Sequence, residues 1–250
     1  MLEDIAIGVG LFGLLLFSLE AGFRAGRRSL DESEASSIGQ VGAIQGAVLG
    51  LLGLLLAFSF AAAGARFLER QDLIVQEANA IGTAFLRASL LDEPHRTELR
   101  GALQRYTEHR VALSAQLREG LPDGALDEVE RLQGKIWRAA EEGVTARPVT
   151  MLAVLSPVND VIDMHSTRIA ASRKHLPSLV IWLLIACSVV AIAVIGYGSG
   201  LGGRRRAPLT VALVALVGTC LWITFDLDLP RSGFLKLSDA PLATLRFESW

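Results

Sequence analysis

The sequence predicts an all-α, polytopic membrane protein with four transmembrane helices and an extramembrane helical bundle inserted between helices two and three. Of the 250 residues, 51% are hydrophobic and 20% are charged, a combination that a soluble domain rarely shows. The two kinds of residue are separated along the chain, because no Asp, Glu, Lys or Arg occurs in 35–65, 175–203 or 207–225. About 20 apolar residues cross the hydrocarbon core as a helix, so each stretch is long enough to span a membrane.

The first membrane span is the least apolar of the four, because Glu20 lies near its end. Arg24 follows four residues later, in the favourable order for an ion pair along a helix. We place the spans near 5–23, 38–63, 177–198 and 207–226. The chain then divides into a transmembrane hairpin at 1–63, a helical insert at 64–176, and a second transmembrane hairpin with a short polar tail at 177–250.

The insert is expected to be helical because its apolar residues recur every three or four positions. These residues are Leu99, Leu103 and Tyr106; Leu126, Val129, Leu132 and Ile136; and Leu152, Leu155, Val158, Val161 and Ile162. We expect residues 66–91 to continue the second span as one long helix. Proline and glycine in Pro122-Asp-Gly124 predict a turn between two helices of the insert.

The short connections between paired spans are rich in arginine, which predicts the orientation. Arg27 and Arg28 lie in the first connection, and Arg204-Arg-Arg206 lies in the second. Because short basic loops stay in the cytoplasm, this charge pattern puts the N-terminus, the insert and the C-terminus outside. Arg66 and Arg70, just after the second span, favour the opposite orientation. The predicted location is the bacterial cytoplasmic (inner) membrane.

No motif in the sequence predicts catalysis. The letters of Gly8-Val-Gly-Leu-Phe-Gly13 match the dinucleotide fingerprint, but that motif requires a preceding strand, and here it lies inside an apolar span. No nucleophile lies beside a visible base, and the histidines lack metal-ligand spacing. The net charge of -2 gives no polycation for nucleic acid. We therefore expect no enzyme, no cofactor and no nucleic-acid partner.

A stripe of glycines follows the second span. Gly42, Gly46 and Gly50 recur every four residues, and Gly53 extends them. Glycine stripes let helix backbones approach closely, which is a main source of helix contact in lipid. The stripe predicts either ordinary packing within the chain or a position at an oligomer axis or pore. In the second case Leu54 and Phe58 would form a hydrophobic constriction that gates by dewetting.

Polar residues among small or apolar neighbours predict a network of buried charges. Its candidate members are Glu20 and Arg24; Glu77, Asn79 and Arg87; and Asn159, Asp160, Asp163 and Arg168. We expect Glu77, Arg87, Asp163 and Arg168 to converge, because a buried acid needs a cation. The network is either a structural set of ion pairs or a vestibule that selects or senses ions.

Two acids at the end of the fourth span, Asp226 and Asp228, are weak candidates for a metal site. Calcium requires six to eight oxygen ligands, so two carboxylates alone predict little. The alternative is a polar helix end at the membrane edge, terminated by Pro230.

Four of these segments together resemble a bacterial bestrophin-like membrane protein family, a domain-of-unknown-function family. The resemblance covers nearly the whole chain, and the segment that begins at Glu77 is its most specific part. The segments are Glu20-Ala-Gly-Phe-Arg24, Gly53-Leu-Leu-Leu-Ala-Phe-Ser-Phe60, Glu77-Ala-Asn-Ala-Ile-Gly-Thr-Ala-Phe-Leu-Arg87 and Asp226-Leu-Asp-Leu-Pro-Arg-Ser-Gly233.

The resemblance implies an architecture and a function. Bestrophins are oligomeric anion channels with four membrane helices and a helical cytosolic part, so the resemblance puts the insert in the cytoplasm, against the charge pattern. Their second helix forms a hydrophobic neck. In animal members an acidic clasp after the fourth helix binds calcium, and the full acidic run of that clasp is absent here.

These observations predict an oligomeric ion channel or pore of bestrophin-like architecture. The expected partners are the lipid bilayer, further copies of the chain and small ions. The alternative is a non-conducting membrane sensor or scaffold whose helical insert binds a partner. Oligomeric state in mild detergent separates the two, because a monomer with four helices has no room for a conducting axis.

Overall fold

The computed structural model describes residues 2–29, 35–116, 124–203, 207–229 and 234–247, and these contain helices and no strand. The predicted turn residues 122–123, Arg204-Arg-Arg206 and 230–233 lie outside the described residues. In chain order the helices are α1 (Leu2–Arg28), α2 (Ala35–Arg87), η2 (Ala88–Leu90), α3 (His95–Gln116), α4 (Ala125–Ala146), η3 (Pro148–Thr150), α5 (Met151–Arg173), α6 (Ser178–Leu201), α7 (Ala207–Asp228) and α8 (Ala240–Ala243).

Four helical stretches are long and apolar enough to cross a membrane, so the chain is a multi-pass membrane protein. They are Ala6–Arg28, Gly39–Leu90, Pro148–Leu201 and Pro208–Asp228. Only the charge-free parts of the second and third, 39–65 and 175–201, are treated below as membrane-spanning. The prediction that the second span continues as one long helix is confirmed as far as Arg87, where α2 ends after 53 unbroken residues, and η2 follows in place of the predicted last turn.

The chain forms two compact units. The first unit contains 1–66 and 175–235, and the second contains 67–174 and 236–250. The chain passes between the units three times: within α2 after Arg66, after Lys174, and after Leu235.

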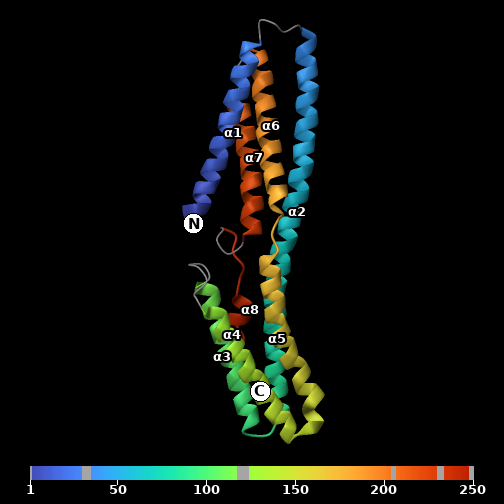
Figure 1. Cartoon of the computed structure of the whole chain (residues 1–250), viewed down its shortest axis with the longest axis vertical. Coiled ribbons are helices and arrows are strands. Elements are labelled where there is room, and N and C mark those ends of the chain that lie inside the picture. The colour runs from blue at the N-terminus through green and yellow to red at the C-terminus, as the bar shows by residue number, and fades with distance from the viewer. Residues whose placement is uncertain (1, 30–34, 117–123, 204–206, 230–233, 248–250) are drawn as a thin grey trace. The chain divides into compact units, whose positions relative to one another are not determined.

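In the first unit, α1, α6 and α7 pack together (Figure 1). Their facing sides form an apolar core. The buried side chains come from all three helices and from α2, and include Leu15, Leu52, Ile192 and Leu221. Ser18 on α1 donates a hydrogen bond to the carbonyl oxygen of Val189 on α6, at 2.6 Å. This bond satisfies a hydroxyl that would be costly to bury alone.

Helices α1 and α6 touch backbone to backbone through four glycines. On each helix two glycines are spaced four residues apart, and each pair faces the carbonyl oxygens of the other helix. A Cβ atom on any of them would lie well inside 3.0 Å of such an oxygen, a distance that real Cβ atoms essentially never show. The four are Gly22, Gly26, Gly196 and Gly200. Such close crossings allow the dispersion contacts that hold helices together in lipid.

A glutamine gives α2 a polar contact with α6, beside the apolar contacts of Leu52. The side-chain amide of Gln45 donates to the carbonyl oxygen of Val194 on α6, at 2.9 Å. Gly198 makes room for this side chain, because a Cβ there would overlap the Gln45 amide. Gln45 therefore makes a polar contact inside the bundle, whereas Gln40 is exposed.

In the second unit, the end of α2 packs with α3, α4, α5 and α8 around a second core. Most of the apolar residues predicted to line the insert are buried in it, among them Leu99, Leu103, Tyr106, Val129, Ile136, Val158 and Val161. Leu152 is an exception and is 86% exposed. The side chain of Leu126 lies outside the described ones.

The segment 236–247, which the sequence analysis treats as part of a polar tail, packs on the second unit. Leu242 is 2% exposed in that core, and Phe247 meets Phe85 edge-on with ring centroids 5.0 Å apart. Gln71 on α2 accepts from the backbone N–H of Ser238 and donates to its carbonyl oxygen.

The glycine crossing predicts the effect of adding one methyl group to α1. Gly22→Ala should lower the free energy of unfolding by about 1–3 kcal/mol, because the new Cβ overlaps a backbone oxygen that cannot rotate away. Gly13→Ala on the same helix is the matched control, since a Cβ there has nothing within 4 Å. Denaturant unfolding in mild detergent measures both. Equal stability of the two variants would contradict the backbone contact between α1 and α6.

Candidate functional site

One face of α2 in the membrane-spanning segment has no partner among the described residues. A Cβ atom on any glycine of the predicted stripe would meet nothing within 4 Å. These glycines are Gly42, Gly46, Gly50 and Gly53. The stripe therefore does not mediate packing within the chain, and that alternative of the sequence analysis is wrong for the described residues.

The same face carries large apolar side chains. Leu54 is 54% exposed and Phe58 is 67% exposed, and both continue the four-residue row of the glycines. The opposite side of the helix holds the buried residues Leu52 and Ser59. Helix α2 is thus packed on one side and open on the other, along a charge-free length.

The glycines that let two helix backbones touch are the pairs Gly22 and Gly26 on α1 and Gly196 and Gly200 on α6, whose packing role was not predicted from the sequence. Both pairs have the spacing Gly-x-x-x-Gly, the same spacing as on α2. The spacing shows that a helix could pack closely at these glycines, but it does not identify which helix faces them.

The acids at the end of α7 have structural roles. Asp226 accepts the backbone N–H groups of Phe234 and Leu235, at 2.7 and 2.8 Å. Asp228 accepts the N–H of Leu176 and pairs with Arg66, whose Nε lies 3.2 Å from Oδ1.

The contacts of these two aspartates give no support to the predicted metal site. Their oxygens already bind N–H groups, and the Arg66 guanidinium disfavours a second cation beside Asp228. The alternative, a polar helix end, agrees with this geometry.

Glu20 and Arg24 form the predicted pair along α1, with Nε 2.9 Å from Oε1. The Arg24 side chain is 72% exposed, so the pair is a surface interaction and not part of a buried network. An exposed pair of this kind contributes little to stability.

In the second unit, a buried carboxylate lies at the centre of a charged cluster. The Glu77 side chain is fully buried and binds the guanidinium groups of Arg110 and Arg168. Arg110 Nε lies 3.0 Å from Oε1, and the Tyr106 hydroxyl donates to the same oxygen at 2.8 Å. Asp239 lies 3.9 Å from Arg168. The Glu77 carboxylate thus connects α2 to both α3 and α5.

The electrostatics of this cluster keep the Glu77 carboxyl ionised. Burial alone raises its pKa, but the charges and hydrogen bonds of Arg110 and Arg168 outweigh burial, so the pKa is lowered overall. Burial and then the Glu77 charge raise the pKa of the Tyr106 hydroxyl, which therefore remains a donor.

His165 on α5 lies beside the cluster and is 5% exposed. Burial and the positive charge of Arg110 lower its pKa to about 4, although Glu77 acts in the opposite direction. Its Nδ1 is buried without a hydrogen-bond partner among the described residues. The imidazole is therefore neutral near pH 7.

Several residues predicted for the network lie elsewhere. Asn79 and Asp160 are exposed, and Arg87 is exposed and donates to the carbonyl oxygen of Ala153. Asp163 accepts from Asn159 at 2.7 Å on an exposed face of α5. The prediction that Arg87 and Asp163 converge on Glu77 is wrong, because they lie on outer faces of their helices.

Arg110 was not predicted from the sequence as the partner of Glu77. Its neighbours Glu108 and His109 indicate a polar face. The available signal was the spacing from Tyr106, because residues four apart share a helix face, and Tyr106 was predicted to be buried.

Comparison with known proteins agrees with this architecture. The family model of the Bestrophin-like domain matches residues 10–242. A crystal structure of a bacterial bestrophin homolog from Klebsiella pneumoniae, with a tyrosine-to-alanine mutation, matches with a TM-score of 0.65 and 15% identity, covering 92% of this chain and 95% of that chain. Comparison with curated proteins gives no match.

The apolar helices and the structural likeness define a multi-pass membrane protein with the bestrophin fold. The family match extends over nearly the whole chain. The chain belongs to the Bestrophin-like family.

The Glu77 cluster predicts a large cost for removing its central charge. Glu77→Gln should lower the free energy of unfolding by about 3–5 kcal/mol, because Arg110 and Arg168 lose their counter-charge while remaining largely buried. Glu69→Gln on the same helix is the control, since Glu69 pairs with Lys174 at an exposed position. The cluster is contradicted if the losses from Glu77→Gln and Arg168→Met are additive in the double variant.

The lowered pKa values predict acid sensitivity. Between pH 6.5 and about 4 the unfolded chain binds a proton at His165 that the folded chain does not, so stability falls as the pH falls. Glu77 causes a further loss of stability at pH values below its ordinary pKa, because its pKa in the folded state is lowered. His165→Gln should flatten the unfolding free energy between pH 6.5 and 4. An unchanged slope would contradict a neutral, buried His165.

Proposed function

We propose that the chain is an oligomeric ion channel of the bacterial inner membrane, in which the open face of α2 from each copy lines the conducting axis. Gly42, Gly46, Gly50 and Gly53 let neighbouring α2 helices approach. Leu54 and Phe58 form the hydrophobic constriction that gates by dewetting.

The open face of α2 is the observation that carries this proposal. Its glycines meet no atom of the described chain, and its large side chains Leu54 and Phe58 are exposed. Lipid alone would satisfy such a face, but a glycine stripe gains more from contact with another helix. Four helices in one copy enclose no axis, so further copies supply the missing walls.

Membership of the Bestrophin-like family supports a channel, because the family and its fold are those of membrane channels. The long extension of α2 beyond the membrane suits this function. The Glu77 cluster fixes that extension to α3 and α5 through ion pairs.

Purified protein in liposomes tests the proposal. We expect several copies per particle in mild detergent and a flux of halide or small cation across the vesicle. Phe58→Ala should raise this flux several-fold, because a narrower apolar side chain makes wetting of the constriction easier. Phe17→Ala on α1, at a position that is 72% exposed, is the matched control and should leave the flux unchanged.

Two results would contradict the channel. A single copy per particle would leave α2 facing lipid. Stable assembly without flux of either ion class would favour the non-conducting sensor or scaffold, whose second unit binds a partner.

A further inference from the structure

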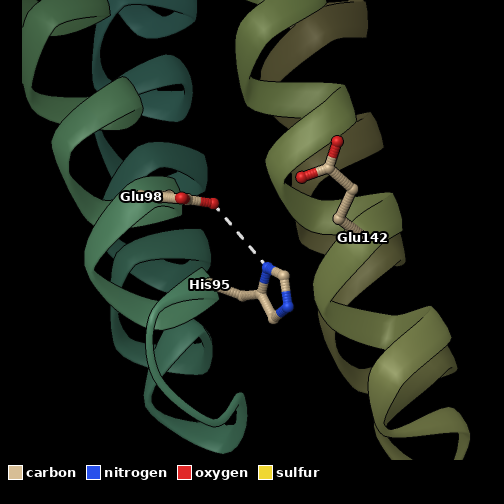
Figure 2. A group of neighbouring side chains, drawn as sticks. All are labelled: His95, Glu98 and Glu142. Carbon is tan, nitrogen blue, oxygen red and sulfur yellow. Dashed lines mark ion pairs between the residues drawn. The ribbon is translucent and has the colours of Figure 1, made fainter.

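We propose that His95, Glu98 and Glu142 form a divalent metal site in the second unit, selective for zinc over magnesium and calcium. His95 and Glu98 lie in the first turn of α3, and Glu142 lies near the end of α4 (Figure 2). This site is separate from the Glu77 cluster and from the open face of α2.

The three ligand atoms are already close together. One nitrogen of His95 and one oxygen from each glutamate all lie within 4.8 Å of one another. Nδ1 of His95 lies 3.7 Å from Oε2 of Glu98. Two ligands in a tetrahedral zinc site, each about 2.1 Å from the ion, lie about 3.4 Å apart. Small rotations of the exposed glutamate side chains suffice to close the set.

The imidazole nitrogen gives an independent reason to expect a ligand. Nδ1 of His95 is buried and has no hydrogen-bond partner among the described residues. Buried polar atoms nearly always have a partner, and an ion is one explanation for an exception. A zinc ion between Nδ1 and the two carboxylates provides this partner.

The backbone around the site is held in place. Gly143 follows Glu142, and a Cβ on it would lie 2.6 Å from Leu91 and 3.1 Å from Cβ of His95. A side chain at Gly143 would have to displace the end of the Leu91 side chain, so glycine favours this close approach of α4 to the start of α3. Arg96 also donates twice to the carbonyl oxygen of Leu91. These contacts hold the start of α3 against α4 at the site.

The charges near the site leave its two glutamates available. Glu93 pairs with Arg96, and Asp92 pairs with Arg147. Glu98 and Glu142 form no ion pair with a lysine or arginine anywhere in the described part of the chain. A divalent cation offsets their two negative charges.

The ligand set favours zinc. Imidazole binds zinc and other transition metals well, whereas magnesium and calcium prefer oxygen ligands alone. One histidine and two carboxylates supply three ligands, and water supplies the fourth position.

Isothermal titration calorimetry on tag-free full-length protein in mild detergent tests the site with zinc chloride. We expect one saturable equivalent of zinc per chain, and no comparable binding of magnesium or calcium. His95→Gln and Glu142→Gln should each weaken zinc binding by at least about tenfold, because each removes a direct ligand. Glu141→Gln is the matched control, with the same charge change at the preceding exposed position of α4.

Thermal unfolding gives a second measurement. Zinc should raise the unfolding temperature of the wild type and of Glu141→Gln, and not that of His95→Gln, because only a bound ligand stabilises the folded state. Thermal unfolding without metal shows whether each variant is folded. If His95→Gln does not fold, Glu142→Gln replaces it in this test, because Glu142 is exposed and its substitution should leave the fold intact. Equal zinc affinity of wild type and Glu142→Gln, or no saturable binding by the wild type, would overturn the site.

Discussion

The separation of charge along the chain is the constraint on which both units depend. A backbone in hydrocarbon must satisfy all its hydrogen bonds within the helix, so the charge-free stretches can form only long helices. Those helices gain little from burying apolar surface, and they hold together through close glycine contacts and single polar bonds such as Gln45 to Val194. The charged stretches form the second unit, with an apolar core and ion pairs.

The second unit shows how a buried charge becomes structural. Glu77 would be costly to bury alone, yet it binds two arginines and a tyrosine from other helices. Replacing the whole cluster by apolar side chains would also fill the space. The ion pairs instead require α3 and α5 to meet α2 at one register, which apolar contact alone specifies less strictly.

Helical spacing in the sequence predicted which faces of the insert are buried, because a period of 3.6 residues identifies a face without knowledge of its partner. It did not identify partners. Glu77 was expected among buried charges, but Arg110 was missed because its neighbours are polar. Glycine spacing was noticed on α2, where the face is open, and missed on Gly22 and Gly196, where the backbones touch. The partner of a buried charge or of a glycine depends on which helices meet, and a single sequence does not contain this information.

The interleaved glycines of α1 and α6 have a mechanical consequence. If either helix slid along the other by one residue, a side chain would meet a carbonyl oxygen, so the pair moves as one rigid body. The described polar contact between α2 and α6 is a glutamine side chain that can rotate, and Gly198 beneath it gives it room. The other described contacts of α2 in the first unit are also made by side chains, with Leu52 in the apolar core and Arg66 paired with Asp228, so α2 can shift against α6 more easily than α1 can.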